Sequence, residues 1–240
     1  MWKICSFFVV ATMMVSPALA GPDDQPETGS RLAKSTRPGP QLSPEQANRA
    51  AQALANCLVS KREGSATTYL LSRDEKGAQS MDWTLRRDVG CLNIGPEMGD
   101  MSSTRVVTIP TDLFRGKLAE ALLRADTKSI EALPAMALQK QYVRPWYPIT
   151  TRHTYIDEMA ICVAETNPRG INTVLMTRPD SSEEVVAFKA LIPSLPPCLR
   201  AGANLTANRQ ALRAALAEGL WQRIHAPAAE QVNPPEEKAK

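Results

Sequence analysis

Apolar residues recur every three or four positions in several segments of the chain, which is the spacing of one buried face of an α-helix. The two clearest helices are predicted to begin at Thr111-Asp112 and at Asn208. Side chains of these types favour the start of a helix. The apolar positions that follow are Leu118, Ala121, Leu122 and Ala125 in one helix and Leu212, Ala215, Leu216, Gly219 and Leu220 in the other.

Two other segments carry signals for the start of a helix. Residues 43–45 (Ser-Pro-Glu) place an N-cap residue, a proline at the first helical position and an early acid in order. The helix that follows has Cys57 on its apolar side, and residues 155–163 repeat this spacing. Residues 181–184 (Ser-Ser-Glu-Glu) form a capping box, and Pro193 should stop the helix that it opens.

Residues 65–72 and 170–177 are ambiguous between helix and strand. Both segments are rich in threonine and other β-branched residues, which suit a strand as well as a short helix. We favour short helices at both places.

The two halves of the chain resemble each other at nearly constant offsets. Residues 54–57 match residues 159–162 at an offset of 105, and residues 115–123 match residues 213–221 at an offset of 98. Small insertions and deletions between two copies of one unit explain the difference between the offsets. We therefore predict an all-α chain of two tandem related helical units.

The same reading gives the organisation of the chain. Polar and proline-rich composition predicts disorder at both ends of the helical part. The predicted segments are a signal peptide (1–20), a disordered leader (21–42), helical unit 1 (43–126), a connector (127–152), helical unit 2 (153–225) and a disordered tail (226–240).

The first twenty residues have the order of a secretory signal: Lys3, then an apolar run of 12 residues, then Ala-Leu-Ala at 18–20. This run is too short to span a bilayer, and no later segment approaches the required length. The formal charge of +3 is small and its signs are scattered, which gives no footprint for nucleic acid. We predict a periplasmic or secreted protein with no membrane span.

Four cysteines remain after removal of the signal, and an even number in an exported chain favours disulfides over metal ligands. Four cysteines allow three pairings. A unit that folded before duplication had only its own two cysteines, so we predict Cys57 with Cys91 and Cys162 with Cys198. Bridges between the units would require the pairing to have changed after duplication. The alanine-rich helices bury little area per residue, so these bridges should compensate for a weak core.

Candidate catalytic chemistry is sparse. His153 and Asp157 are four residues apart, with Glu158 adjacent, so on a helix the histidine and an acid could share one face. A capping or surface contact at the start of a helix is the interpretation that we favour for this spacing. None of the common hydrolase, metalloprotease or nucleotide-binding motifs is present in the sequence. Met98 and Met101 do not form a convincing metal motif, so we assign no catalytic, cofactor or metal residue.

The connector contains the best candidate for contact with a partner. Arg144, Trp146 and Tyr147 are flanked by prolines, and arginine and aromatic residues dominate binding hot spots. The alternative is a linker whose aromatic side chains cover the seam between the two units.

The pattern of a helix ending in Cys, a second Cys some 35 residues later, and then Arg-x-x-Leu-Ala-Glu-x-Leu resembles a group of uncharacterised exported proteins of Gram-negative bacteria. The resemblance rests on the four cysteines and the two Leu-Ala-Glu segments, over about residues 45–225. It implies an envelope location and no assigned activity. We expect a non-catalytic module that binds an unknown envelope protein; a small hydrolase using His153 with Asp157 or Glu158 is the alternative.

Overall fold

A computed structural model of the chain describes residues 43–92, 109–200, 205 and 208–227. Within these ranges the regular structure is entirely helical, which confirms the all-α prediction. None of the helices in the described ranges is long and apolar enough to span a membrane. The elements in order are α1 (Pro44–Leu71), α2 (Glu75–Arg86), α3 (Val89–Leu92), α4 (Thr111–Ala125), α5 (Thr127–Glu131), the 3-10 turn η1 (Tyr147–Thr150), α6 (Thr154–Thr166), α7 (Pro168–Met176), α8 (Ser182–Leu191), the 3-10 turns η2 (Ile192–Ser194) and η3 (Pro196–Cys198), and α9 (Arg209–His225).

The helix starts that the sequence predicts are present at the expected residues. Ser43, Ser181 and Asn208 each accept a hydrogen bond from the backbone N–H three residues later. These bonds satisfy donors that the first turn of a helix leaves without partners. Helix α4 begins at Thr111 as predicted, but its N-cap residue is Pro110, which makes no side-chain cap.

The two ambiguous segments are helical. Residues 65–71 form the last turns of α1, beyond a kink at Arg62, and residues 170–176 belong to α7. In each helix a threonine hydroxyl donates to the carbonyl four residues earlier, from Thr68 in α1 and Thr173 in α7. This bond lets a β-branched threonine fit a helix.

One helix of the structure was missing from the sequence prediction. Helix α2 was not among the predicted helices, although Asp74 caps it and Ala78 and Leu85 face the core. Only these two residues of α2 are buried, so few apolar positions mark the helix in the sequence. Pro193 lies just beyond the end of α8, as the sequence predicts, since the α-helix stops at Leu191 and the chain continues as a 3-10 turn. A proline fits the first positions of such a turn because its missing N–H is not needed there.

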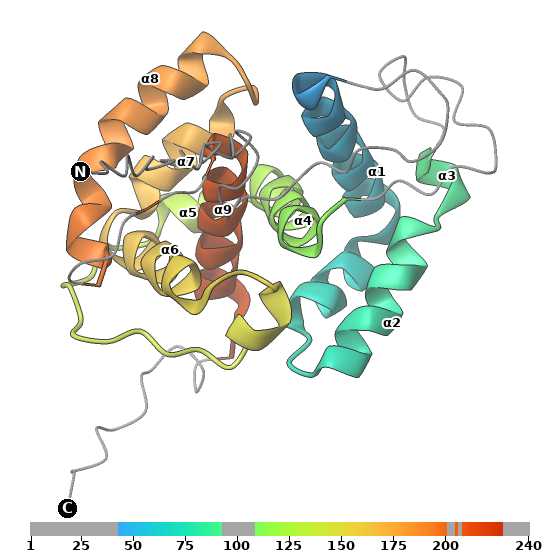
Figure 1. Cartoon of the computed structure of the whole chain (residues 1–240), viewed down its shortest axis with the longest axis horizontal. Helices are drawn as coiled ribbons and strands as arrows, with labels where there is room; N and C mark the ends of the chain where they lie inside the picture. Colours follow the sequence, from blue (N-terminus) through green and yellow to red (C-terminus); the bar gives the residue numbers. More distant parts are fainter. Residues whose placement is uncertain (1–42, 93–108, 201–204, 206–207, 228–240) are drawn as a thin grey trace, which may run out of the picture.

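Helices α4 and α9 cross at the centre of the molecule, with α1 to α3 on one side and α6 to α8 on the other (Figure 1). Small residues make this crossing possible. A Cβ atom added to Gly116 of α4 would lie 2.3 Å from the Cβ of Ala214 in α9. A Cβ on Gly219 would lie 2.9 Å from the backbone of Ala160 in α6. The backbones therefore approach too closely for larger side chains.

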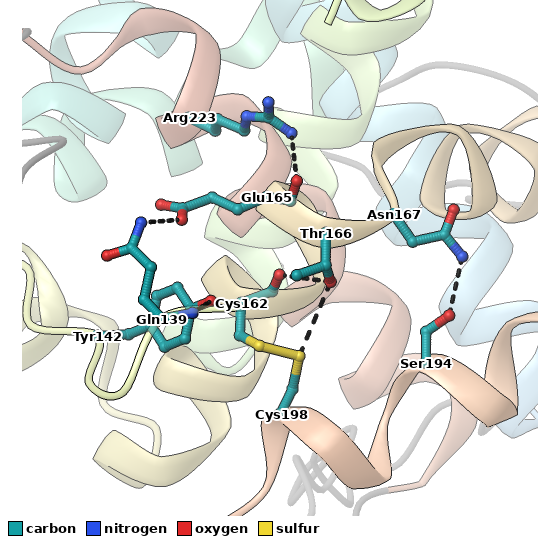
Figure 2. Close-up of a disulfide and its surroundings, with 9 residues drawn as sticks. All are labelled: Gln139, Tyr142, Cys162, Glu165, Thr166, Asn167, Ser194, Cys198 and Arg223. Carbon is teal, nitrogen blue, oxygen red and sulfur yellow. Dashed lines mark hydrogen bonds between the residues drawn. A yellow bond between two sulfur atoms is a disulfide. The ribbon is translucent and has the colours of Figure 1, made fainter. Parts of the chain in front are cut away.

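The predicted disulfides are both present. Cys57–Cys91 joins α1 to α3, and Cys162–Cys198 joins α6 to the turn η3. Figure 2 shows the second bridge, with the Thr166 hydroxyl 3.9 Å from the sulfur of Cys198. Each bridge therefore fastens a short outer segment to one of the long inner helices.

Candidate functional site: a groove along helix α2

The sequence-predicted acid and base are not brought together. His153 lies exposed at the N-terminus of α6, where its side chain makes no cap. Asp157 is completely buried and accepts hydrogen bonds from Thr150 (2.6 Å) and Arg152 (2.7 Å). Burial raises the pKa of Asp157 to about 6, although the charge of Arg152 opposes the rise. The carboxylate that would orient His153 is thus committed elsewhere.

Glu158 does not assist His153 either. Its carboxylate forms a bidentate ion pair with Arg200, which follows the turn η3. This pair fastens the end of the disulfide-linked segment to α6. Among the described residues, neither of the two predicted acids is therefore a partner for the histidine.

Arg144, Trp146 and Tyr147 are buried, so they are not presented to a partner. Trp146 has 0% of its surface exposed and meets Tyr147 edge to face at 4.7 Å. Arg144 donates to Glu165 of α6 at 2.7 Å. Large aromatic side chains bury much area in a core that is otherwise rich in alanine. The connector therefore contributes these side chains to the core.

The remaining sequence candidates give no site. Met98 and Met101 lie outside the described residues. In the part of the chain that the structure covers, no group of histidine, cysteine, aspartate or glutamate side chains could hold a metal ion.

A buried ionic network joins the central helices. Arg115 of α4 donates to Glu218 of α9 at 2.7 Å, and Arg152 donates to the other oxygen of Glu218 at 2.6 Å. Arg152 also binds Asp157, so four charged side chains form one chain. Burial alone would raise the pKa of Glu218, but the charges of Arg115 and Arg152 outweigh it and hold that pKa below its usual value.

A second network joins the same two helices, but here the arginine belongs to α9 and the glutamate to α4. Arg213 of α9 binds Glu120 of α4 through two hydrogen bonds of 2.8 and 2.9 Å, and it also binds Glu184 of α8. Burial alone would raise the pKa of Glu120, but its hydrogen bonds to Arg213 outweigh it and hold the pKa below its usual value.

Both central arginines also bind the C-terminal carbonyls of a neighbouring helix. Arg115 donates to the carbonyls of Tyr69 and Leu70 at the end of α1. Arg213 donates to those of Val174 and Leu175 at the end of α7. The last carbonyls of a helix lack partners within it, so these bonds satisfy groups that would otherwise be buried unpaired. Arg115 thus links three helices, α1, α4 and α9, and Arg213 links four, because it also binds Glu184 of α8.

Sequence reasoning noticed the repeated Arg-x-x-Leu-Ala-Glu segments but not what their charges do. The arginine and glutamate of each segment are five residues apart, at Arg115 and Glu120 and again at Arg213 and Glu218. A charged pair at the same two places in two helices whose other positions predict a buried face was the signal that could have revealed the networks.

Lys117 is the most unusual of the buried charges. Only 1% of its surface is exposed, and its ammonium group has no hydrogen-bond partner among the described residues. Burial lowers the pKa of Lys117 to about 8, although the charge of Glu120 opposes the fall. An unpaired buried ammonium group costs free energy of folding.

The groove that we consider the candidate site runs along α2 and has a volume of about 420 Å³. This size lies within the range of ligand pockets. Besides α2, the lining comes from the turn that contains η1, from the end of α1 and from the start of α4. The lining residues are Tyr69, Arg73, Glu75, Ala78, Gln79, Asp82, Trp83, Arg86, Arg87, Thr111, Pro148, Ile149 and Thr151.

Trp83 is the large apolar side chain of this groove that is most exposed to solvent. The side chain is 64% exposed, and the guanidinium of Arg87 lies 4.0 Å from its ring centroid. An arginine stacked on an aromatic ring keeps its edge donors available. The groove therefore presents an apolar face and a cation side by side.

The inner charges of the groove are already paired. Asp82 accepts hydrogen bonds from the Tyr69 hydroxyl at 2.7 Å and from Arg86 at 2.6 Å. Arg73 donates to carbonyls at the end of α1 and to Gln222 of α9. These contacts hold the walls in place and leave the outer residues to meet a ligand.

The turn that contains η1 contributes a strained residue to the lining. Thr151 has a φ of 63°, in the left-handed region that β-branched residues rarely adopt. The next residue is Arg152, whose side chain belongs to the buried network. Strain of this kind persists where surrounding contacts enforce it, and it is concentrated at functional sites. The network thus holds the groove wall in its position.

Comparison of the chain with protein-family models, with curated proteins and with solved structures found no match. The groove must therefore be interpreted from its own geometry.

Proposed function

We propose that this protein is a non-catalytic binding module of the bacterial envelope, and that the groove along α2 receives a segment of a partner protein. The observation that carries this proposal is the exposed Trp83 with Arg87 stacked on it at the edge of a groove. Tryptophan and arginine are the residues that most often dominate protein–protein contacts.

The export part of the proposal rests on the sequence and on the cysteines. Residues 1–20 have the composition of a secretory signal, and the four remaining cysteines form two bridges. Disulfides persist in oxidising compartments such as the bacterial periplasm. The resemblance to exported Gram-negative proteins agrees with this location.

We also propose that the fold arose by tandem duplication of a helical unit. Arg115 and Glu120 lie 98 positions before Arg213 and Glu218, and each arginine binds the glutamate of the other helix. Gly116 and Ala214, which are also 98 positions apart, meet at the crossing of α4 and α9. Two copies of one unit that are related by an approximate two-fold axis would make such reciprocal contacts between equivalent residues.

Site-specific photocrosslinking in the producing cells tests the binding proposal. A photoreactive residue replaces Gln79, which lines the groove and is exposed, or Val186, an exposed residue of α8 that serves as the control. The proposal predicts a discrete protein adduct from position 79 that disappears when Trp83→Ala is added. Adducts of equal yield at both positions, or none at position 79, would overturn it.

A further inference from the structure

The charges along the groove are not evenly distributed. Glu75 lies in the first turn of α2 and Arg87 directly follows its last residue. A helix of this length extends about 18 Å at 1.5 Å per residue. A segment bound along the groove would therefore meet an exposed acid near one end and an exposed cation near the other. Arg73 also lines the groove near Glu75, but it is less exposed and donates to backbone carbonyls and to Gln222.

Arg87 is the cation that a ligand can reach. The side chain is exposed, and it makes no ion pair with any carboxylate in the described part of the chain. Stacking on Trp83 fixes the plane of the guanidinium while its edge donors face away from the ring. A planar fork of donors matches the two oxygens of a carboxylate.

Glu75, at the other end of the groove, disfavours a second carboxylate in the ligand. It is exposed and accepts a hydrogen bond from Gln79 at 2.9 Å. Its charge would repel a second carboxylate at that end of a ligand. The groove is thus complementary to one carboxylate in one position rather than to a run of acidic residues.

The surface between these two charges is largely apolar. Ala78, Trp83 and Ile149 line it, and the aromatic ring of Tyr69 closes the inner side. Such a surface takes up an aliphatic or aromatic side chain.

Resting on the proposed function, we propose that the groove selects a peptide segment in which one apolar side chain is followed closely by a single carboxylate. The apolar side chain packs on Trp83, and the carboxylate binds Arg87. The ligand is thereby defined by two points of contact at a fixed separation, which gives specificity as well as affinity.

Fluorescence anisotropy with peptide pools tests this selection on the mature, disulfide-bonded protein. The probes are fluorescein-labelled short peptides with one position randomised over Leu, Ile, Val, Met and Phe. In three separate pools the residue that follows the randomised position is Glu, Gln or Lys. A fourth pool carries Glu on both sides of the randomised position. At low salt the single-Glu pool should bind about fivefold more tightly than the Gln pool, as for a partly exposed ion pair, and the Lys pool should bind weakest.

Three variants of groove residues and one control variant show which side chains cause the effect. Arg87→Gln should make the Glu and Gln pools bind equally, whereas the matched variant Arg169→Gln, an exposed arginine in α7, should leave their ratio unchanged. Glu75→Gln should improve binding of the double-Glu pool by about threefold through loss of repulsion. Trp83→Ala should weaken the binding of all four peptide pools.

The outcomes separate the two proposals. If no pool binds, or if Trp83→Ala changes nothing, the groove is not a peptide site and the proposed function fails with this inference. If the Glu, Gln and Lys pools bind equally, or if Arg87→Gln leaves the preference for Glu intact, only the inferred carboxylate selection is overturned.

Discussion

Arg115 of α4 and Glu218 of α9 form an ion pair of 2.6 Å in which neither side chain is exposed to solvent. They are 103 residues apart in the chain and join the two helices that cross at the centre of the molecule. Removing one partner of a buried pair leaves a charge that neither water nor protein compensates.

The substitution Glu218→Gln should therefore destabilise the protein severely, because both Arg115 and Arg152 lose their carboxylate. The expected loss in the free energy of unfolding is about 3 to 5 kcal/mol. Urea denaturation followed by circular dichroism measures it. Glu183→Gln, at an exposed position in α8, is the control and should change stability by less than about 0.5 kcal/mol. Equal stabilities for the two variants would show that the buried network is not important for folding.

Two glycine substitutions should have opposite effects. Gly116→Ala places a Cβ atom 2.3 Å from that of Ala214, so the central helices must separate, at an expected cost of about 1 to 3 kcal/mol or more. Gly64→Ala, in α1, meets nothing within 4 Å and should raise stability by about 0.5 to 1 kcal/mol through helix propensity. Thermal unfolding of the two variants checks both signs, and a stable Gly116→Ala protein would contradict the close crossing.

Lys117→Met should stabilise the protein. The pKa of Lys117 is about 8 in the folded state and 10.5 for an ordinary lysine, and this difference corresponds to roughly 3 kcal/mol at neutral pH. Because the folded-state pKa is the lower one, the cost is complete below about pH 8 and diminishes as the pH rises toward the unfolded value. The difference in the free energy of unfolding between Lys117→Met and the wild type should therefore decrease between about pH 8 and 10.

Denaturant titrations at several pH values test this dependence on Lys117. Lys189→Met, at an exposed position of α8, should show neither the gain nor the narrowing. A Lys117→Met protein less stable than wild type at neutral pH would mean that the ammonium group is satisfied by a partner after all.

The two disulfides should contribute similarly, because they close loops of similar length, with sequence separations of 34 and 36. By the chain-entropy estimate each contributes about 3 to 4 kcal/mol. The double substitutions Cys57→Ala with Cys91→Ala, and Cys162→Ala with Cys198→Ala, should each lower the free energy of unfolding by this amount. A loss confined to one of the two variants would contradict the equal contribution.

Thr151→Gly should relieve backbone strain in the groove wall. A β-branched residue at a φ of 63° costs about 1 kcal/mol or more, and glycine adopts this conformation freely. We expect a gain in stability of about 1 kcal/mol, reduced by the greater entropy of glycine in the unfolded chain. Thermal unfolding would measure the change, and a loss of stability would mean that contacts of the threonine side chain outweigh the strain.

Local features of this chain were predictable from sequence because their causes are local. Ser43 and Asn208 act as caps through hydrogen bonds to residues three positions away. The disulfide pairing followed from the repeated cysteine spacing. Helix α2 escaped prediction because only a few of its residues, such as Ala78 and Leu85, face the core.

The candidate site was not predictable because distant segments build it. Trp83 and Ile149 line the same groove although 66 positions separate them in the sequence. Nothing local to Trp146 shows that it is buried whereas Trp83 is exposed, since both are tryptophans beside arginine-containing segments. Their opposite environments depend on the packing of the central helices.

The central claim is that the groove beside Trp83 is the binding surface, and the indole N–H signals of the mature protein test it most directly. After removal of the predicted signal, three tryptophans remain: Trp83 in the groove, and Trp146 and Trp221 in the core. On titration with the single-Glu peptide pool in a ¹H–¹⁵N NMR spectrum, the account predicts that the Trp83 signal shifts and that the other two stay in place. A Trp83 signal that does not move at saturating peptide would contradict the account.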